Sequence, residues 1–324
     1  MIVSRSAAFL LSPHKKLYSR LCYGDNGKSI AKWLLLFILN LSSEEKLFSQ
    51  SFVDVFNGSL QGLNTHYKDL PATANQTSNI YLNVTLPIKL DSHNYLILKP
   101  YFENLASQRG TGSGAEVYNL YSGILPIGIQ HETRDKKWQY LVLGMPKLSS
   151  DFVDKVSGRD FQMGGYGVVT YRKSENLKIK FGVYYNSEFF GTFIVPLAAV
   201  DWKVNSRLKM YGIMPINYRI EYNIIKGKLS GGFAYKGYTR TYRLSSDFNH
   251  GYVRNNEILL KLYLDYYVSK HWVLFAEFGR TILFSPLSYF NGTKDGISQV
   301  SPIYFPIQDA FLANMGLAYR INLE

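Results

Sequence analysis

Charged side chains recur at every second position along otherwise apolar stretches of this 324-residue sequence. We single out twelve as candidates for contact with a solute: Lys89, Lys178, Lys180, Arg219, Glu221, Lys236, Arg240, Glu257, Lys261, Asp265, Glu277 and Arg320. A further five share their parity, which gives twelve basic against five acidic residues: Lys99, Arg172, Lys203, Lys228 and Asp201. If one water-filled space received all these side chains, its positive excess would favour anions. If the space were narrow, they would pair across strands, for example Lys261 with Glu221 or Glu277.

No other pattern of reactive residues indicates catalysis or a cofactor. The histidines of the main region lie far apart in sequence and form no helical metal-binding motif: His66, His93, His131, His250 and His271. The glycine-rich run 110–114 lacks the lysine and hydroxyl residue that complete a phosphate-binding loop, so we interpret it as a connecting loop. The single cysteine, Cys22, precedes the expected cleavage site, which excludes a disulfide framework. We therefore predict no enzyme, no cofactor and no metal site.

Strands must position the charged residues, and residues 256–268 show the clearest strand pattern. The even positions are all apolar or aromatic: Ile258, Leu260, Leu262, Leu264, Tyr266 and Val268. The odd positions include Glu257, Lys261 and Asp265. A period of two predicts a β-strand, because successive side chains point to opposite faces. A soluble sheet would turn its apolar face to a core, whereas a membrane barrel turns it outward to lipid.

The same alternation recurs from residue 51 onward, with no competing helical period. It predicts fourteen strands, at 51–61, 77–90, 94–103, 117–130, 137–147, 160–173, 176–187, 195–204, 207–214, 217–225, 228–241, 255–268, 271–284 and 310–323. The number falls to twelve if the two segments around Pro215 merge or leave the wall. The predicted fold is therefore all-β, a transmembrane antiparallel up-and-down β-barrel of 12–14 strands.

The links between these segments alternate in length. The short ones are 91–93, 174–175, 205–206, 226–227 and 269–270, and the long ones are 62–76, 104–116, 148–159, 242–254 and 285–309, with 215–216 a short exception. Outer-membrane barrels have short turns at one rim and long loops at the other, whereas a soluble sandwich has no reason to sort its loops. Trp138, Trp202 and Trp272 all lie near short links, where tryptophan favours a membrane interface.

Residues 1–50 differ from the rest and are predicted to be a leader that includes a signal peptide. Lys28 and Lys32 precede an apolar run at 33–39, and a more polar stretch follows to Gln50. The apolar run is too short for a helix that spans a bilayer, which needs about 20 residues. We therefore expect export, with residues 51–324 forming the barrel.

The overall composition agrees with a barrel and argues against nucleic acid as a partner. Aromatic residues make up 15% of the sequence, and 26 residues are tyrosine, which suits strands and membrane interfaces. The mean hydropathy of −0.11 excludes a helical membrane protein but not a barrel, in which half of each strand is polar. The net charge is +12, yet the basic residues are spread over alternating strands instead of forming one patch.

Several short motifs carry a family resemblance: 83–88 (NVTLPI), 195–196 (VP), 202–205 (WKVN), 214–215 (MP) and 219–222 (RIEY). On these motifs, residues 51–324 resemble the outer-membrane β-barrel proteins of Gram-negative bacteria, including a porin-like family of unknown function. The resemblance implies a place in the outer membrane of a Gram-negative bacterium, contact with its lipids and insertion by the barrel assembly machinery. That machinery often reads a terminal aromatic residue, a signal that Tyr319 or Leu323 would supply here. The resemblance brings no catalytic residues.

We expect a passive or substrate-selective pore with a basic lumen, for which small anionic solutes are candidate partners. The alternative is a packed structural barrel that presents its external loops to partners. A barrel enzyme that acts on lipid is a less favoured possibility.

The sequence also makes a local prediction about Arg280. This residue shares its parity with Trp272, Ala276 and Phe278, which belong to the lipid-facing set. Arginine on that face is tolerated near an interface and costs about 2–4 kcal/mol at mid-membrane, so we expect Arg280 at the outer interface. The competing interpretation is a bulge at Gly279 that turns the side chain into the lumen.

Overall fold

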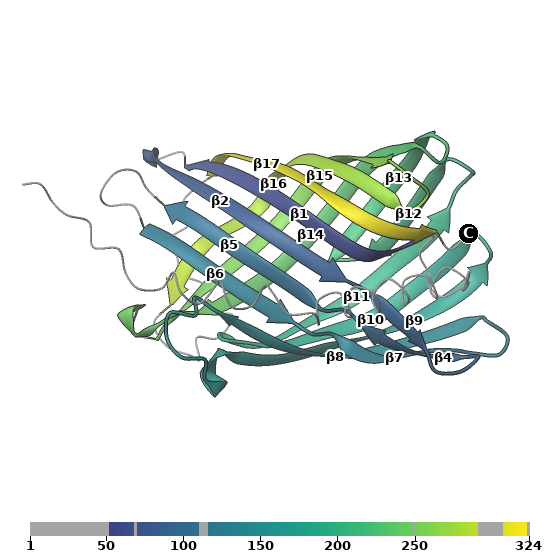
Figure 1. Ribbon diagram of the computed structural model, residues 1–324, viewed down its shortest axis with the longest axis horizontal. Coiled ribbons are helices and arrows are strands. Elements are labelled where there is room, and N and C mark those ends of the chain that lie inside the picture. Colours follow the sequence, from purple (N-terminus) through teal and green to yellow (C-terminus); the bar gives the residue numbers. More distant parts are fainter. Residues whose placement is uncertain (1–51, 68–69, 110–115, 249, 291–306, 323–324) are drawn as a thin grey trace, which may run out of the picture. The chain divides into compact units, whose positions relative to one another are not determined.

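The computed structural model describes residues 52–67, 70–109, 116–248, 250–290 and 307–322. In these ranges, the strands form one continuous sheet that closes on itself, because the last strand pairs with the first (Figure 1). The two described helices, η3 (Gly158–Asp160) and η4 (Ser246–Phe248), are single turns, and neither could cross a membrane. The predicted leader at 1–50 lies outside the described residues and stays a prediction.

The strands follow one another around the barrel in chain order. They are β1 (Phe52–Tyr67), β2 (Leu70–Val84), β3 (Leu86–Lys89), β4 (Asn94–Leu98), β5 (Tyr101–Arg109), β6 (Glu116–Ile124), β7 (Ile127–Glu132), β8 (Trp138–Ser150), β9 (Phe161–Ser174), β10 (Leu177–Glu188), β11 (Gly191–Lys203), β12 (Leu208–Ile213), β13 (Asn217–Ile225), β14 (Leu229–Arg243), β15 (Tyr252–Tyr267), β16 (Trp272–Phe290) and β17 (Ile307–Asn322).

The barrel wall consists of fourteen strand paths, which we call staves. Three of these staves are each interrupted once, so they account for six of the seventeen labelled strands. The interruptions fall at Thr85, at Lys99-Pro100 and at Leu125-Pro126, so β2 with β3, β4 with β5 and β6 with β7 each form one path. Proline has no N–H to donate to a neighbouring strand, which explains the last two breaks. The predicted antiparallel barrel is confirmed with fourteen strands, and both segments around Pro215 belong to the wall.

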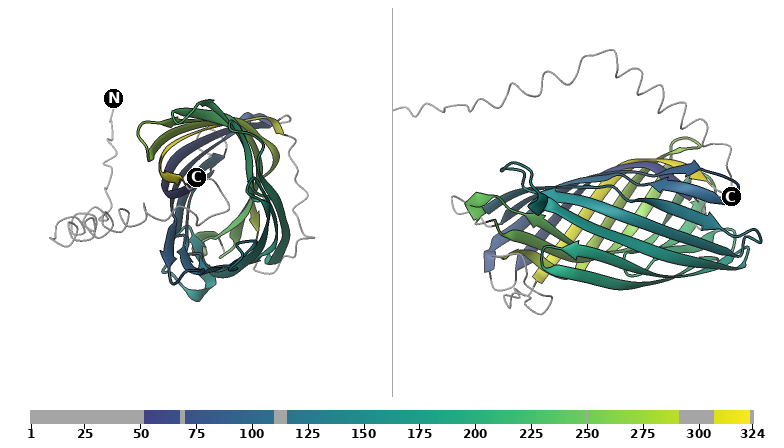
Figure 2. Two further views of the ribbon diagram at one scale, coloured as in Figure 1. Left: turned by 90° about the vertical axis from the view of Figure 1, so that its right-hand side faces the viewer. Right: turned by 90° about the horizontal axis from the view of Figure 1, so that it is seen from below.

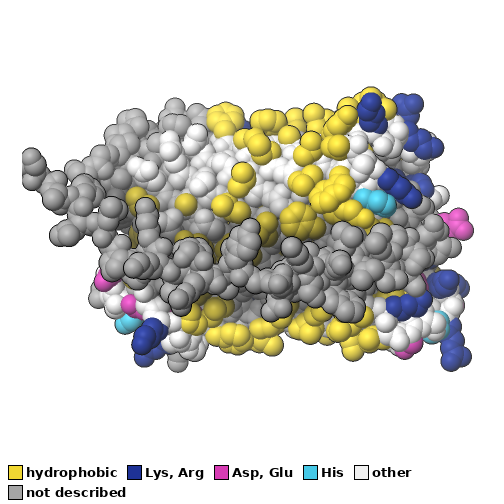
Figure 3. Space-filling view, in the orientation of Figure 1, with side chains coloured by type: hydrophobic (Ala, Val, Ile, Leu, Met, Phe, Trp, Pro, Cys, Tyr) yellow, Lys and Arg dark blue, Asp and Glu magenta, His cyan; other side chains and the backbone are white. Residues whose placement is uncertain are grey.

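The predicted alternation of side chains sorts apolar residues to the outside. On β15, Leu262 is 67% exposed, whereas Lys261 and Tyr263 on either side of it are buried. Exposed apolar side chains cover the middle of the surface in Figure 3, and charged side chains gather toward the two ends. This arrangement inverts that of a soluble sheet, because the large apolar side chains lie where a soluble protein would meet water.

The two rims differ as predicted from the links. The turns 90–93, 133–137, 175–176, 204–207, 226–228 and 268–271 form what we call the short-turn rim, and the loops 151–160 and 244–251 belong to the long-loop rim. In the turn at 90–93, hydrogen bonds from Asn94 and from the backbone of His93 lower the pKa of Asp91.

The strands run further toward the long-loop rim than the sequence predicts. β1 and β2 stay paired from Phe56↔Val84 as far as Tyr67↔Leu70, so the predicted long link 62–76 was wrong over most of its length. The apolar alternation fades after Leu63, because Asn64 is exposed on the face that Leu60 occupies lower down. The backbone pairing of β1 with β2 thus continues beyond the residues whose apolar alternation predicts a strand.

One hairpin of the wall is much shorter than its neighbours. β12 and β13 are joined through residues 214–216, and β13 pairs with β14 only as far as Asn217↔Lys236. Gly212 makes this tight hairpin possible, since its φ of +137° is unfavourable for other residues. A Cβ at Gly212 would also lie 2.5 Å from the carbonyl oxygen of Asn217. Above Lys236, β14 continues without β13 beside it.

We predict that Gly212→Ala destabilises the barrel by about 1–3 kcal/mol, because it combines an unfavourable φ with a backbone clash. Unfolding in urea, followed by tryptophan fluorescence and by heat-modifiable gel migration, measures the effect. Gly62→Ala is the matched control, since a Cβ there would meet nothing within 4 Å. Equal stability of the two variants would contradict the role of Gly212.

Candidate functional site

Most of the predicted solute-contacting residues lie inside the barrel, at different depths. Seven are buried: Lys180, Glu221, Glu257, Lys261, Asp265, Glu277 and Arg320. Four are partly exposed: Lys178, Arg219, Lys236 and Arg240. Lys89 is exposed at the end of β3, beside a turn of the short-turn rim. The candidates therefore extend from that rim into the interior.

One group of these residues forms a network of ion pairs in the half of the barrel toward the short-turn rim. Arg320 is 1% exposed, and its guanidinium lies 2.6 Å from a carboxylate oxygen of Asp54 and 2.8 Å from one of Asp265. Arg219 lies 2.8 Å from Glu277, which also pairs with Lys261. Arg219 on β13 and Glu277 on β16 are not on neighbouring strands, so their side chains meet through the interior.

Two further ion pairs join buried side chains on other strands. Lys180 lies 2.5 Å from Asp201, and the Lys147 ammonium lies 3.4 Å from Glu188. Four of the paired residues were not predicted from the sequence: Asp54, Glu103, Lys147 and Glu188. Glu103 shares the parity of Lys99 on the same stave, so that signal was present in the sequence. Three of the four are acidic, and each of these carboxylates pairs with an interior cation.

Toward the long-loop rim, opposite walls of the barrel touch each other. Arg240 and Tyr242 on β14 reach Glu103 on β5, each at 2.5 Å from one of its carboxylate oxygens. Gln162 on β9 donates a hydrogen bond of 2.8 Å to the hydroxyl of Thr241. We call these five residues the cross-wall cluster. β5 and β14 lie on opposite sides of the closed strand order (Figure 2), so the contacts of the cluster cross the interior at this level.

Apolar contacts reinforce the cross-wall cluster. The Tyr242 side chain packs with Leu105 and Leu120 of the facing wall, and Leu244 and Val253 complete this group. All five are buried. The upper part of β14 can reach the facing wall because β13 ends beside Lys236. The level at which β13 ends is therefore also the level above which β14 contacts the facing wall.

An interior cavity lies on the short-turn side of the cross-wall cluster. Its volume is about 350 Å³, and its walls include Lys99, Arg219, Lys236 and the rings of Tyr81 and Tyr101. A second cavity of about 230 Å³ shares Lys99, Gly212 and Asn217 with the first. Polar and aromatic groups surround the first space, whereas aliphatic side chains such as Ile97, Leu141 and Leu197 form much of the wall of the second.

Lys99 and Lys236 differ from the other interior cations. In the described part of the chain, neither side chain forms an ion pair with a carboxylate. The Lys236 ammonium instead lies over the rings of Tyr81 and Tyr238, at 4.7 and 5.6 Å from their centroids. An unpaired ammonium in a confined cavity favours an anion beside it. Among the described residues, no group of His, Cys, Asp and Glu could hold a metal ion.

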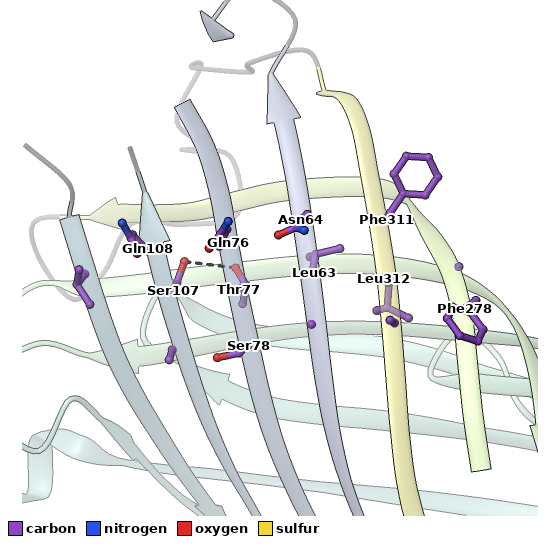
Figure 4. A pocket seen from close by; sticks show the side chains of 15 residues that line it. Leu63, Asn64, Gln76, Thr77, Ser78, Ser107, Gln108, Phe278, Phe311 and Leu312 are labelled. Atoms are coloured by element: carbon purple, nitrogen blue, oxygen red, sulfur yellow. Dashed lines mark hydrogen bonds between the residues drawn. The ribbon is translucent and has the colours of Figure 1, made fainter. Parts of the chain in front are cut away.

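The outer wall carries a shallow hollow of about 670 Å³ across β16, β17, β1, β2, β5 and β6 (Figure 4). Small residues deepen it: Gly62, Ser78, Ala106 and Ala313. Phe278 and Phe311 stand at one end. Asn64, Gln76 and Gln108 lie in one row across paired strands, so the outer surface becomes polar at this height.

Arg280 lies next to this row, on the outward face of β16. Its side chain is exposed, and its guanidinium lies 5.3 Å from the centroid of the Phe311 ring. Phe311 in turn pairs with Asn64 of the polar row. The strand does contain a bulge, but it lies beyond Thr281, so the proposed bulge at Gly279 was wrong.

Comparisons with known proteins give one family and a set of similar barrels. A family model described as a domain of unknown function (DUF6268) matches residues 122–320. None of the curated proteins matches the sequence.

Three of the similar solved structures come from bacteria. An outer membrane channel from Pseudomonas putida F1 is 8% identical, with 86% of this chain and 98% of that chain covered and a TM-score of 0.39. The toluene transporter TodX from Pseudomonas putida is 10% identical, with 86% and 92% covered and a TM-score of 0.39. The outer membrane phospholipase from Salmonella typhi, solved as a dimer with bound calcium, is 10% identical, with 89% and 98% covered and a TM-score of 0.34.

We predict that a cysteine at position 280 is accessible from outside the cell, because the outer wall becomes polar at its height. In a chain without other cysteines, Arg280→Cys should react with a membrane-impermeant maleimide added to intact cells. Ala276→Cys is the control, four residues lower on the same face, and should react about tenfold more slowly because lipid covers it. Equal rates at both positions would contradict this placement.

Proposed function

The chain belongs to the family of the domain of unknown function DUF6268, and from that premise we propose that it is an outer-membrane barrel that passes small anions selectively. The apolar outer surface supports the membrane location. A closed barrel satisfies its backbone hydrogen bonds internally and leaves no open sheet edge in lipid. The outward side chains of the middle rows, such as Leu262, Phe278 and Met315, are the exposed apolar groups that lipid would cover.

The unpaired lysines in the interior cavity carry the proposal for anions. Lys99 and Lys236 face a space of about 350 Å³, while other interior cations, such as Lys261 and Arg320, have carboxylate partners. A charge that is removed from water and left unpaired costs free energy, and an entering anion would offset that cost. Cations, in contrast, would meet no unpaired carboxylate of similar prominence in this cavity, since Glu277 and Asp54 are both paired.

The cross-wall cluster makes a narrow, selective route more consistent with the geometry than an open pore. Its contacts join β14 to β5 and β9 across the interior, and a solute could pass only if they separate. The protein would then conduct poorly at rest.

A packed structural barrel is the second candidate, and the same cluster supports it. Salt bridges such as Arg240–Glu103 fill the interior with side chains that satisfy each other. In that case the long-loop rim, and not the interior, would carry the function.

Planar-bilayer recordings of the refolded protein separate the two candidates. We predict little steady current for the wild type and a conductance increased several-fold in the double variant Arg240→Gln/Glu103→Gln, which removes both charges of the pair together. The control is Arg172→Gln/Glu132→Gln, which removes a more exposed pair outside the cluster. Silence of both variants at all voltages would favour the structural barrel.

A second prediction concerns ion selectivity in the conducting variant. Reversal potentials under a salt gradient should show anion preference, and adding Lys99→Gln and Lys236→Gln should reduce it, because these lysines supply the unpaired positive charge. Lys226→Gln, in an exposed turn of the short-turn rim, should leave the preference unchanged. Cation preference before the lysines are changed would refute the proposed solute class.

A further inference from the structure

A third polar cavity lies at the long-loop rim, away from the lysine-lined space. Its volume is about 210 Å³. The loop 151–160 and the end of β14 with the following residues form its walls, which include Lys155, Arg159, Asp160, Arg243 and His250. None of these residues lines either of the interior cavities described above. The cavity is therefore a separate space at the opposite end of the cross-wall cluster.

The two loops that form this cavity are locked together by hydrogen bonds. The backbone N–H of Asp151 donates to the carbonyl of Arg243 at 3.0 Å, and the backbone N–H of Ser245 donates to the Asp151 carboxylate at 2.8 Å. Asp154 accepts from the backbone N–H of Ser246 at 2.7 Å. These contacts hold the end of β14 against the end of β8 and fix the cavity wall.

The carboxylates of the cavity are already occupied by the loops. Asp151 and Asp154 accept the backbone hydrogen bonds that join the two loops. Asp160 accepts from the backbone N–H and the hydroxyl of Ser157, at 2.7 and 3.1 Å, and so closes the capping box of η3. His250 lies 3.8 Å from Asp154. The acidic residues thus serve to shape the site.

The Arg243 guanidinium, in contrast, has no partner among the described residues. The residue is only 6% exposed, and its Nη1 is buried with no hydrogen-bond acceptor in that part of the chain. Arg159 lies near enough for the two positive charges to repel each other, and the attraction of Asp160 opposes this only in part. A buried, unpaired guanidinium next to a second cation is costly unless an anion lies between them.

We propose that this cavity binds an oxyanion, a carboxylate or phosphate group, between Arg243 and Arg159. The planar guanidinium presents parallel N–H donors that match the two oxygens of such a group. Lys155, on the same loop as Arg159, adds a third positive charge at the wall. The role of this site as the first contact for an entering anion rests on the proposed function, whereas the binding itself does not.

Calorimetric titration of the refolded protein in detergent tests the binding without any membrane current. Inorganic phosphate and malonate should each bind saturably to the wild type. Arg243→Gln should weaken binding by about ten- to a hundredfold, since it removes charge-assisted hydrogen bonds. Arg243→Lys should give an intermediate affinity, because the charge stays and the paired donors are lost. Lys226→Gln at the other rim is the control and should bind like the wild type.

Arg159→Gln keeps the test decisive if the buried Arg243 variants fail to fold, because Arg159 is exposed and its loss should still weaken binding several-fold. A short-chain soluble phosphatidic acid forms a further arm: affinity at least tenfold above that of phosphate, lost in Arg159→Gln, would identify a lipid headgroup as the source of the oxyanion. Absence of saturable binding to the wild type, or undiminished binding in Arg159→Gln, would overturn the site. Silent bilayer recordings of Arg240→Gln/Glu103→Gln, together with intact phosphate binding, would refute only the proposed permeation.

Discussion

A strand with one apolar and one charged face can bury its charges only if they find partners on other strands, and this requirement shapes the interior of the barrel. Closure of the sheet places the charged faces of all fourteen staves toward one narrow space. Arg320 then reaches Asp54 on one neighbouring strand and Asp265 two strands away. Loss of one partner would leave the other buried and uncompensated, which is far more costly than loss of a surface pair. The network therefore connects β13, β15, β16, β17 and β1 through their side chains.

The short β12–β13 hairpin coincides with contacts that cross the barrel interior. Because the pairing of β13 with β14 stops at Asn217↔Lys236, the part of β14 beyond Lys236 lacks a neighbouring strand on that side. Its inward side chains, Arg240 and Tyr242, find their partner in Glu103 on the facing wall. A local difference in strand length thus accompanies the contact between the two walls.

The sequence predicted the staves well, because side-chain parity is a local property that lipid and lumen enforce on every strand. It could not predict the pairing across the interior. Residues such as Glu103 and Arg240 are 137 positions apart, and their contact depends on how far each stave extends and on where β13 ends. Asp54 and Glu188 were not predicted as interior partners, because they lie near strand ends, where the alternation is weak. The polar upper parts of β1 and β2 were interpreted as a loop because their pairing needs no apolar face.

The cations that remain unpaired are therefore more informative than the total charge. Most interior cations have a carboxylate partner, so a buried cation without one lowers the stability of the fold at its position. The described exceptions occur on both sides of the cross-wall cluster: Lys99 and Lys236 at the cavity on one side, and Arg243 at the cavity on the other. A structural barrel would gain stability from replacing such residues with neutral ones. The carboxylates that line these cavities are instead engaged elsewhere, Glu277 with Lys261 and Asp160 with Ser157, so the positive charge of Lys99, Lys236 and Arg243 is left for another anionic group.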